Sequence, residues 1–175
     1  GIRVRAGCAW RDAGASISKA AIGYYEKGKY AISLEKNLKA IELLKKAGAE
    51  SELFQLQNNV GSIYERNNQF EEAKKMYNDA AEGSLKAKNY EGYVSAKTNY
   101  AMAIRQQGDV KGDIAIYTEM LPLSQKYCRE EFVSQIYQSL GVCERSLHNT
   151  EKGLEYYLKA KEVYDRIGSV SGMSI

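Results

Sequence analysis

Few side chains in this sequence could act as nucleophiles, general bases or metal ligands, and their spacing does not suit such chemistry. His148 is the only histidine, and Cys143 precedes it by five residues. The other two cysteines, Cys8 and Cys128, form no CxxC pair. A zinc site or a nucleophile–base pair needs several such residues together. The sequence therefore predicts no metal site, no cofactor and no catalytic residue.

Phosphate binding and carboxylate catalysis are not indicated either. The stretches at residues 20–23 and 108–113 contain glycine but lack the spacing of a phosphate-binding loop. The pairs Glu71-Glu72 and Glu130-Glu131 fall where helices are expected to begin, and acidic residues there complement the helix dipole. Most of the fourteen tyrosines recur at repeat positions, so they do not call for a base-stacking surface. We expect that the chain is not an enzyme.

The composition limits the partners. The 175 residues include 25 basic and 22 acidic side chains, a balance that does not favour nucleic acid or a membrane surface. No apolar run has the eighteen or so residues of a membrane span, and the first ten residues do not resemble a signal peptide. Three cysteines without a pattern suit a reducing compartment, so we expect a cytoplasmic protein. A single proline favours long helices.

Related residue types recur along the chain at a period of 40. Their offsets of three, four and seven place them on one stripe of a helix, whereas strands would show alternation. Glycine or asparagine at the third set below tolerates the left-handed backbone that ends a helix. The sets are Ala21, Gly61, Ala101 and Gly141; Tyr24, Tyr64, Ile104 and Glu144; Gly28, Asn68, Gly108 and His148; Tyr30, Phe70, Val110 and Thr150; Ser33, Ala73, Asp113 and Gly153; Asn37, Tyr77, Tyr117 and Tyr157; and Ala40, Ala80, Met120 and Ala160.

The repeat predicts an all-α chain of four helix–turn–helix units. Seven positions depart from the preferred residue type: Glu144, Asn68, His148, Thr150, Asp113, Asn37 and Met120. The predicted helix pairs are 13–27 and 30–47, 51–67 and 70–87, 91–107 and 110–127, and 130–147 and 150–167. Pro122 falls inside the sixth of these helices, where it leaves the carbonyl of Thr118 without its usual donor, so we expect a kink there.

The pattern resembles the tetratricopeptide repeat (TPR) over residues 13–168. The second repeat is the best copy, with Val60-Gly61-Ser62-Ile63-Tyr64, then Asn68-Gln69-Phe70-Glu71-Glu72-Ala73, then Tyr77 and Ala80. The resemblance implies a right-handed α-solenoid of four TPR-like repeats with long helices. Its repeats would cover about 13–48, 49–88, 89–128 and 129–168, within a domain of residues 13–169.

The two ends fit no complete repeat. Residues 1–12 are expected to be a leader or linker, either added or native, or a strand. Residues 170–175 resemble the start of a fifth repeat that is cut short. A solenoid needs a polar cap on its last repeat, and none is found here. We therefore expect a fragment of a longer protein whose uncapped last repeat could allow self-association.

In TPR proteins the first helix of each pair lines a concave groove, and the resemblance carries this groove over to particular residues. Asn59 and Asn99 are the most suggestive, because an asparagine amide offers a donor and an acceptor to one peptide unit. Arg105 and Arg145 are equivalent positions that could pair with carboxylates, or with Glu65 and Glu144 within the chain. The predicted groove residues are Asn58, Asn59, Ser62, Arg66, Thr98, Asn99, Met102, Arg105, Gln138 and Arg145.

The resemblance implies a scaffold that binds a protein or peptide in this groove. The alternative is a ligand-sensing regulatory region of a larger signalling protein, such as a kinase, a cyclase or a transcription regulator. The lysines and arginine of a chaperone-type carboxylate clamp are absent. Their places are taken by Ser18, Ile22, Asn59, Ser95 and Asn99, of which only one asparagine fits, so a chaperone C-terminus is not the expected ligand.

Overall fold

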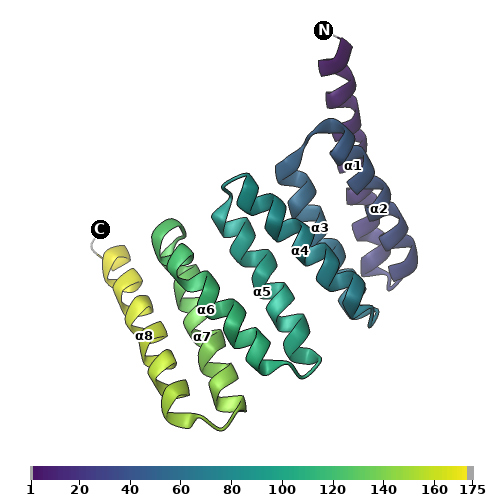
Figure 1. Cartoon of the computed structure of the whole chain (residues 1–175). Coiled ribbons are helices and arrows are strands. Elements are labelled where there is room, and N and C mark those ends of the chain that lie inside the picture. The colour runs from purple at the N-terminus through teal and green to yellow at the C-terminus, as the bar shows by residue number, and fades with distance from the viewer. Residues whose placement is uncertain (1, 173–175) are drawn as a thin grey trace. The chain divides into compact units, whose positions relative to one another are not determined.

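Eight α-helices and no strand make up the part of the chain that the structure describes. The structure is a computed structural model that describes the backbone of residues 2–172 and the side chains of residues 5–168. The helices are α1 (Ile2–Glu26), α2 (Tyr30–Ala47), α3 (Glu50–Arg66), α4 (Phe70–Lys86), α5 (Tyr90–Gln106), α6 (Val110–Tyr127), α7 (Glu130–Ser146) and α8 (Thr150–Gly172) (Figure 1). None of these helices is long and apolar enough to cross a membrane.

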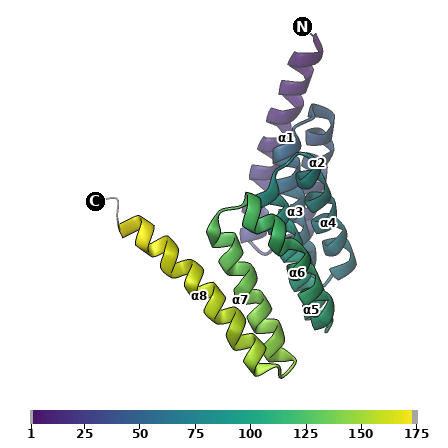
Figure 2. The same ribbon diagram turned by 60° about the vertical axis from the view of Figure 1, so that its left-hand side comes forward.

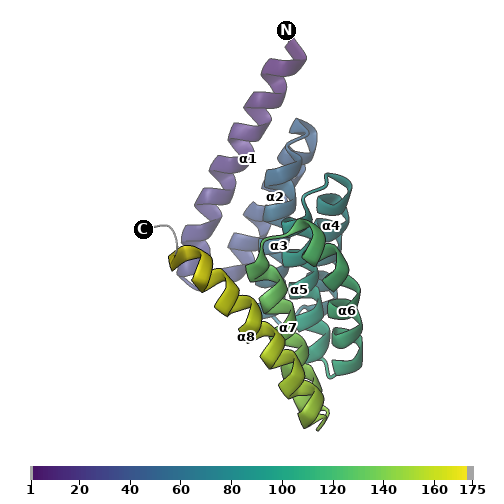
Figure 3. The same cartoon turned by 90° about the vertical axis from the view of Figure 1, so that its left-hand side faces the viewer.

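The predicted helices from α2 to α7 begin and end within one residue of the observed ones. The two outer helices differ from the prediction. Residues 2–12 form neither a strand nor an irregular leader, because α1 begins at Ile2 and contains no proline that would break it. Gly7 lies beside Ala47, the last residue of α2, so the start of α1 extends beyond α2 (Figure 3).

At the other end, α8 continues without a break through Gly168 to Gly172. The sequence predicts that a fifth repeat starts at residue 170, but no turn separates residues 170–172 from α8. Residues 173–175 lie outside the described part. The helix α6 likewise runs from Val110 to Tyr127 as one element that contains Pro122. The kink expected at this proline stays a prediction.

The turn inside each helix pair is made by a residue with left-handed backbone. Gly28, Asn68, Gly108 and His148 have φ values of 71°, 58°, 94° and 63°. In each case the residue that follows donates its N–H to a carbonyl five residues earlier, which ends the first helix of the pair. The 40-residue period thus fixes the turns, and His148 serves at this position although it departs from the preferred type.

Two compact units divide the chain, residues 1–100 and 101–175. In the first unit α1 pairs with α2, and α3 pairs with α4 (Figure 1). The small residues Ala21, Ala40, Ala73 and Ala80 are fully buried between these paired helices, as their place in the repeat predicts. An apolar cluster that includes Ile41 and Leu44 of α2 with Leu56 and Val60 of α3 joins the two pairs.

The second unit contains the end of α5 and the helices α6 to α8. Its helices α7 and α8 lie side by side (Figure 2). The repeat residues Ala101, Met120 and Ala160 are buried, as are Ile136 and Leu140 of α7. The same positions of the period therefore supply the core of both units.

Candidate functional site

Three predicted groove residues of the first unit, Asn58, Asn59 and Ser62, line two hollows that share one wall, α3. The hollow between α1 and α3, which we call the repeat-one pocket, has a volume of about 240 Å³. The second, the α3–α5 pocket, has a volume of about 330 Å³. The repeat-one pocket is lined by Ser18, Ile22, Tyr25, Ser33, Asn37, Leu56, Asn59, Ser62 and Ile63. The α3–α5 pocket is lined by Ser51, Phe54, Gln55, Asn58, Asn59, Ser84, Asn89, Gly92 and Ser95.

Asn59 is the residue that both pockets have in common. Its side chain is exposed, in agreement with its predicted place in the groove. An exposed amide on the wall between two hollows can give one hydrogen bond and accept another from a chain that crosses it.

Asn99 is arranged differently. It is half-buried, and its Nδ2 donates to Oδ1 of Asn58 at 3.0 Å. This hydrogen bond joins α5 to α3 within the first unit. Asn99 therefore contributes to the structure of the groove wall, and only part of its amide can face a ligand.

Two other predicted residues of the first unit also have neighbours within the chain, and a third is half-buried. The hydroxyl of Ser62 lies 3.1 Å from that of Tyr77, which donates its proton to the carboxylate of Glu65 at 2.9 Å. The guanidinium of Arg66 lies 5.5 Å from the centre of the Tyr25 ring, a cation–π distance. Thr98 is half-buried on α5.

The linings of the two pockets contain no charged residue. Their polar groups are hydroxyls and amides, which form hydrogen bonds with neutral peptide groups without attracting a strong charge. An acidic or phosphorylated ligand would find no cation in these walls, so the two pockets suit a largely uncharged segment of chain.

In the second unit Arg105 is paired within the chain. Its Nε lies 3.5 Å from Oδ2 of Asp113, its Nη1 lies 3.6 Å from the sulfur of Cys143, and 28% of its side chain is exposed. The thiol of Cys143 donates to the same oxygen of Asp113 at 2.9 Å. Asp113 and Cys143 are both fully buried. An internal carboxylate thus already pairs with the guanidinium of Arg105, and its predicted pairing with an acidic ligand stays a prediction.

Burial governs the titration of this internal cluster. It raises the pKa of Asp113, although the hydrogen bond from Cys143 and the charge of Arg105 act in the opposite direction. Burial, together with the hydrogen bond to Asp113, raises the pKa of the Cys143 thiol to about 12. Burial also raises the pKa of Tyr117 to about 12. The thiol of Cys143 and the phenol of Tyr117 therefore stay protonated at neutral pH.

Glu144, which interrupts the aromatic set of the repeat, is buried with an ion pair. Its side chain is 2% exposed and lies 2.5 Å from Nζ of Lys152, and Nδ2 of Asn149 donates to it at 2.8 Å. The hydrogen bond from Lys152 lowers the pKa of Glu144. This carboxylate thus pairs at the α7–α8 turn and not with Arg145, which is exposed.

The remaining predicted residues of the second unit, Met102 and Gln138, are also exposed. The outer face of α8 carries two exposed leucines, Leu154 and Leu158. The self-association expected from the sequence stays a prediction. Among the side chains that the structure describes, no three His, Cys, Asp or Glu residues come together as a metal site.

A family profile for the tetratricopeptide repeat matches residues 54–82, which cover most of α3 and α4. The fold of the chain is that of TPR-like repeat proteins. Solved structures support the fold assignment over most of the chain. BtubC (BKLC) from P. vanneervenii matches with a TM-score of 0.75 and 18% identity over 89% of this chain. No curated protein sequence matches the chain significantly.

Two further TPR-like structures are similar. Aspartyl phosphate phosphatase F from Bacillus subtilis matches with a TM-score of 0.78 and 16% identity over 90% of this chain. A Rap protein complexed with Competence and Sporulation Factor matches with a TM-score of 0.66 and 14% identity over 86% of this chain. This chain spans 64% of BtubC, 41% of the phosphatase and 42% of the Rap protein.

Sequence reasoning missed the floor of the repeat-one pocket. Ser33 and Asn37 of α2 form part of it, while Ile22 of α1 lies at the opening. The available signal was Asn37 itself, because it stands where the other three TPR units have tyrosine. The prediction treated that difference as an imperfect repeat and not as a missing side chain.

The cysteines of this TPR chain should differ strongly in reactivity. Cys8 is exposed and Cys143 is buried. A thiol with a pKa of about 12 is almost fully protonated at pH 8, so we expect Cys143 to react with a thiol reagent about 1000-fold more slowly than an ordinary exposed cysteine, or slower. The measurement is the labelling rate of a Cys8→Ser/Cys128→Ser variant, native and unfolded. Fast labelling of the native variant would contradict the buried cluster.

Proposed function

We propose that the chain is a protein-binding scaffold that takes an extended, largely uncharged peptide segment of its partner along α1, α3 and the first part of α5. The observation that carries the proposal is the exposed amide of Asn59 on the wall shared by the repeat-one pocket and the α3–α5 pocket. A segment that crosses this wall could place successive side chains in the two hollows while Asn59 bonds the peptide unit between them.

The comparisons support a binding role in a general way. The similar Rap structure holds Competence and Sporulation Factor, so a TPR-like chain of related fold binds another molecule. The uncharged linings of both pockets support the neutral character of the ligand. We place the protein in the cytoplasm because its cysteines show no disulfide pattern.

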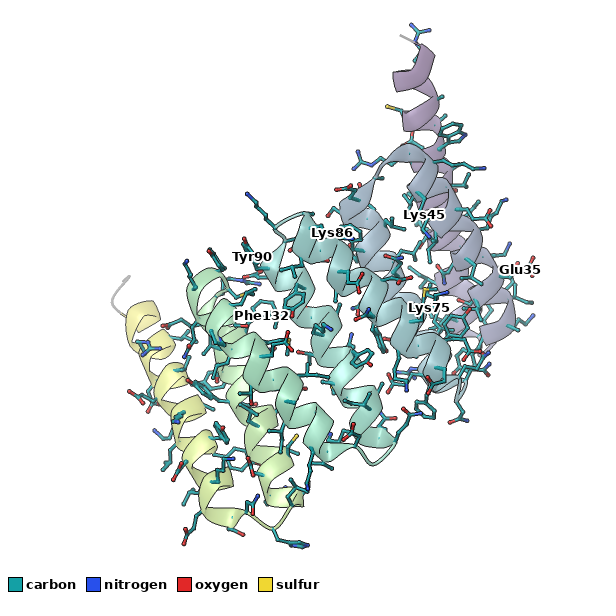
Figure 4. The ribbon with its side chains drawn as sticks, viewed as in Figure 1. Glu35, Lys45, Lys75, Lys86, Tyr90 and Phe132 are labelled. Atoms are coloured by element: carbon teal, nitrogen blue, oxygen red, sulfur yellow. The ribbon has the colours of Figure 1, made fainter. Side chains whose placement is uncertain are left out.

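The test is a selection of randomised 12-residue peptides on the purified chain, followed by affinity measurements with synthetic peptides. We expect Asn59→Ala to weaken binding by about 5- to 30-fold, because a bidentate contact is worth about 1–2 kcal/mol when water is excluded. Its thermal stability should not change, since the side chain is exposed. Lys75→Ala, on the exposed side of α4, is the control and should bind as the wild type does (Figure 4).

Asn99→Ala separates structure from binding in the same assay. It removes the hydrogen bond to Asn58, so we expect a small loss of thermal stability together with any loss of affinity. If no peptide is enriched above background, or if the enriched peptides bind Asn59→Ala as tightly as the wild type, the proposed function is wrong.

The alternative, a ligand-sensing regulatory region, is favoured by the similarity to the Rap protein and to the phosphatase. The same peptides discriminate between the two roles when hydrogen exchange is followed by mass spectrometry. A scaffold should show protection confined to α1, α3 and α5. A sensor should also change exchange in α6 to α8, because a signal must reach the rest of the chain.

A further inference from the structure

The second helix of each TPR unit carries one position that is tyrosine in three units and asparagine in the first. Tyr77 and Tyr117 are almost fully buried at this position. Two of the rings lie against a glycine of the first helix. A Cβ built on Gly61 would overlap the ring of Tyr77, and a Cβ on Gly141 would lie 3.0 Å from the ring of Tyr157. The space between paired helices is thus normally filled by a phenol ring.

In the first unit the ring is absent. Asn37 is buried, but its amide turns to the floor, where Oδ1 accepts from Ser18 and Nδ2 donates to Ser33, each at 3.4 Å. Ser33 in turn donates to the carbonyl of Ala21 at 2.9 Å. The polar groups of the floor therefore bond one another, and the repeat-one pocket remains above them.

The lining of the repeat-one pocket suits a flat, neutral ring. Ile22, Leu56 and Ile63 supply apolar walls, and Tyr25 supplies an aromatic one. Ile22 is 55% exposed at the opening, so an apolar group placed there would remove its side chain from water. At about 240 Å³ the pocket is smaller than those of whole drug-sized ligands, which begin at about 300 Å³. Its size fits a single large side chain.

The opening of the repeat-one pocket also offers hydrogen-bond partners to one polar atom of a ligand. The hydroxyl of Ser62 lies 3.1 Å from that of Tyr77 and gives its proton to it, so the Ser62 oxygen keeps a lone pair that can accept a hydrogen bond from a group in the pocket. The amide of Asn59 lies on the same wall. A phenol, which both donates and accepts, matches this pair, whereas the absence of a cation disfavours a carboxylate or a phosphate.

We propose that the repeat-one pocket binds a tyrosine side chain of the partner, which takes the place of the ring that the first TPR unit lacks. This inference rests on the proposed peptide-binding function and names the side chain that the groove selects. The residues that carry it are Asn37, which leaves the space, and Ile22, Asn59 and Ser62, which surround its opening.

The direct test uses p-cresol, the side chain of tyrosine as a free molecule, followed by the methyl resonances of Ile22, Leu56 and Ile63. We expect shifts confined to these three residues, with a dissociation constant of about 1 mM, as for a ligand of this size. The Asn37→Tyr variant, which supplies the missing ring from within, should bind p-cresol at least tenfold more weakly. Ala101 and Tyr117 coexist in the third unit, so Ala21 can coexist with a tyrosine at position 37.

Glu35→Tyr is the matched control, because it adds the same ring two residues away at an exposed position of α2 (Figure 4). It should bind p-cresol as the wild type does. If Asn37→Tyr does not fold, Ile22→Ser provides a second test, since it removes apolar wall at an exposed site and should weaken binding at least threefold. Equal binding by the wild type and by a folded Asn37→Tyr variant, or shifts spread over other methyl groups, would overturn the inference.

The peptide selection separates this inference from the proposed function. Enriched peptides that contain a tyrosine and lose affinity for Asn37→Tyr support both. Enriched peptides without an aromatic residue, bound equally by Asn37→Tyr, leave the scaffold function standing and overturn the tyrosine pocket. Binding of p-cresol without enrichment of any peptide supports the pocket and overturns the scaffold function.

Discussion

Replacing Arg105 with alanine is expected to lower the free energy of unfolding by about 2–3 kcal/mol at neutral pH, because it leaves the carboxylate of Asp113 buried without its cation. Asp113 is 0% exposed, and its Oδ1 has no hydrogen-bond partner. The expected loss is smaller than for a fully buried pair, since 28% of the Arg105 side chain is exposed and the ion pair is 3.5 Å long. The measurement is chemical denaturation of both proteins.

The loss should shrink as the pH falls. Burial raises the pKa of Asp113 above its ordinary value of 3.8, so the folded protein holds this proton more tightly than the unfolded chain does. The raised pKa of Asp113 therefore contributes stability that is fully present below pH 3.8. This stability is lost as the pH rises through the pKa that Asp113 has in the folded protein. Without Arg105 the folded pKa rises further, so acid should restore more stability to the variant than to the wild type.

Asp113→Ala supplies the control, because the second TPR unit carries a fully buried alanine, Ala73, at the equivalent position. Removing the carboxylate should cost less than removing the arginine, and Arg105→Ala/Asp113→Ala should be more stable than Arg105→Ala at neutral pH. If Arg105→Ala keeps its stability and instead weakens binding of acidic peptides, the groove role predicted from the sequence is correct and the internal ion pair contributes little.

The sequence predicts the fold so closely because both the turns and the small buried residues recur at one period. Gly28 and Gly108 end their helices in left-handed backbone, which glycine adopts without steric cost because it has no Cβ. No such signal exists at the two ends of the chain. The helix α1 contains no proline that would separate residues 2–12 from the rest, and α8 continues through Gly168 although glycine often ends a helix.

The candidate site is less predictable because its properties depend on partners from other helices. Asn59 and Asn99 occupy equivalent positions of the repeat. Asn99 on α5 donates a hydrogen bond to Asn58 on α3, whereas Asn59 is exposed. Arg105 and Arg145 are equivalent too, but Asp113 lies within reach of Arg105, while the same position of the fourth unit is Gly153. The repeat shows which residues occupy equivalent positions. Their contacts differ between units, because residues that depart from the repeat, such as Asp113, supply the partners.

A graded set of glycine replacements is expected to measure how tightly the tyrosines pack. Gly61→Ala should destabilise the protein by about 1–3 kcal/mol, because the new Cβ would lie 2.6 Å from Cδ1 of Tyr77. That ring cannot move freely, since it is 1% exposed and its hydroxyl donates to Glu65 at 2.9 Å and accepts from Ser62 at 3.1 Å. A shift of the ring would lengthen these hydrogen bonds.

Two further alanines calibrate the effect of the first. Gly141→Ala places its Cβ 3.0 Å from the ring of Tyr157, which is only half-buried, so we expect a loss of about 1 kcal/mol or less. Gly23→Ala meets nothing within 4 Å and should stabilise α1 by about 0.5–1 kcal/mol, because alanine is the better helix former. Thermal or chemical denaturation of the three variants gives the order. If Gly61→Ala stabilises the protein as Gly23→Ala does, the ring is not held against the glycine, and the space that Tyr77 occupies in the second unit is wider than the structure shows.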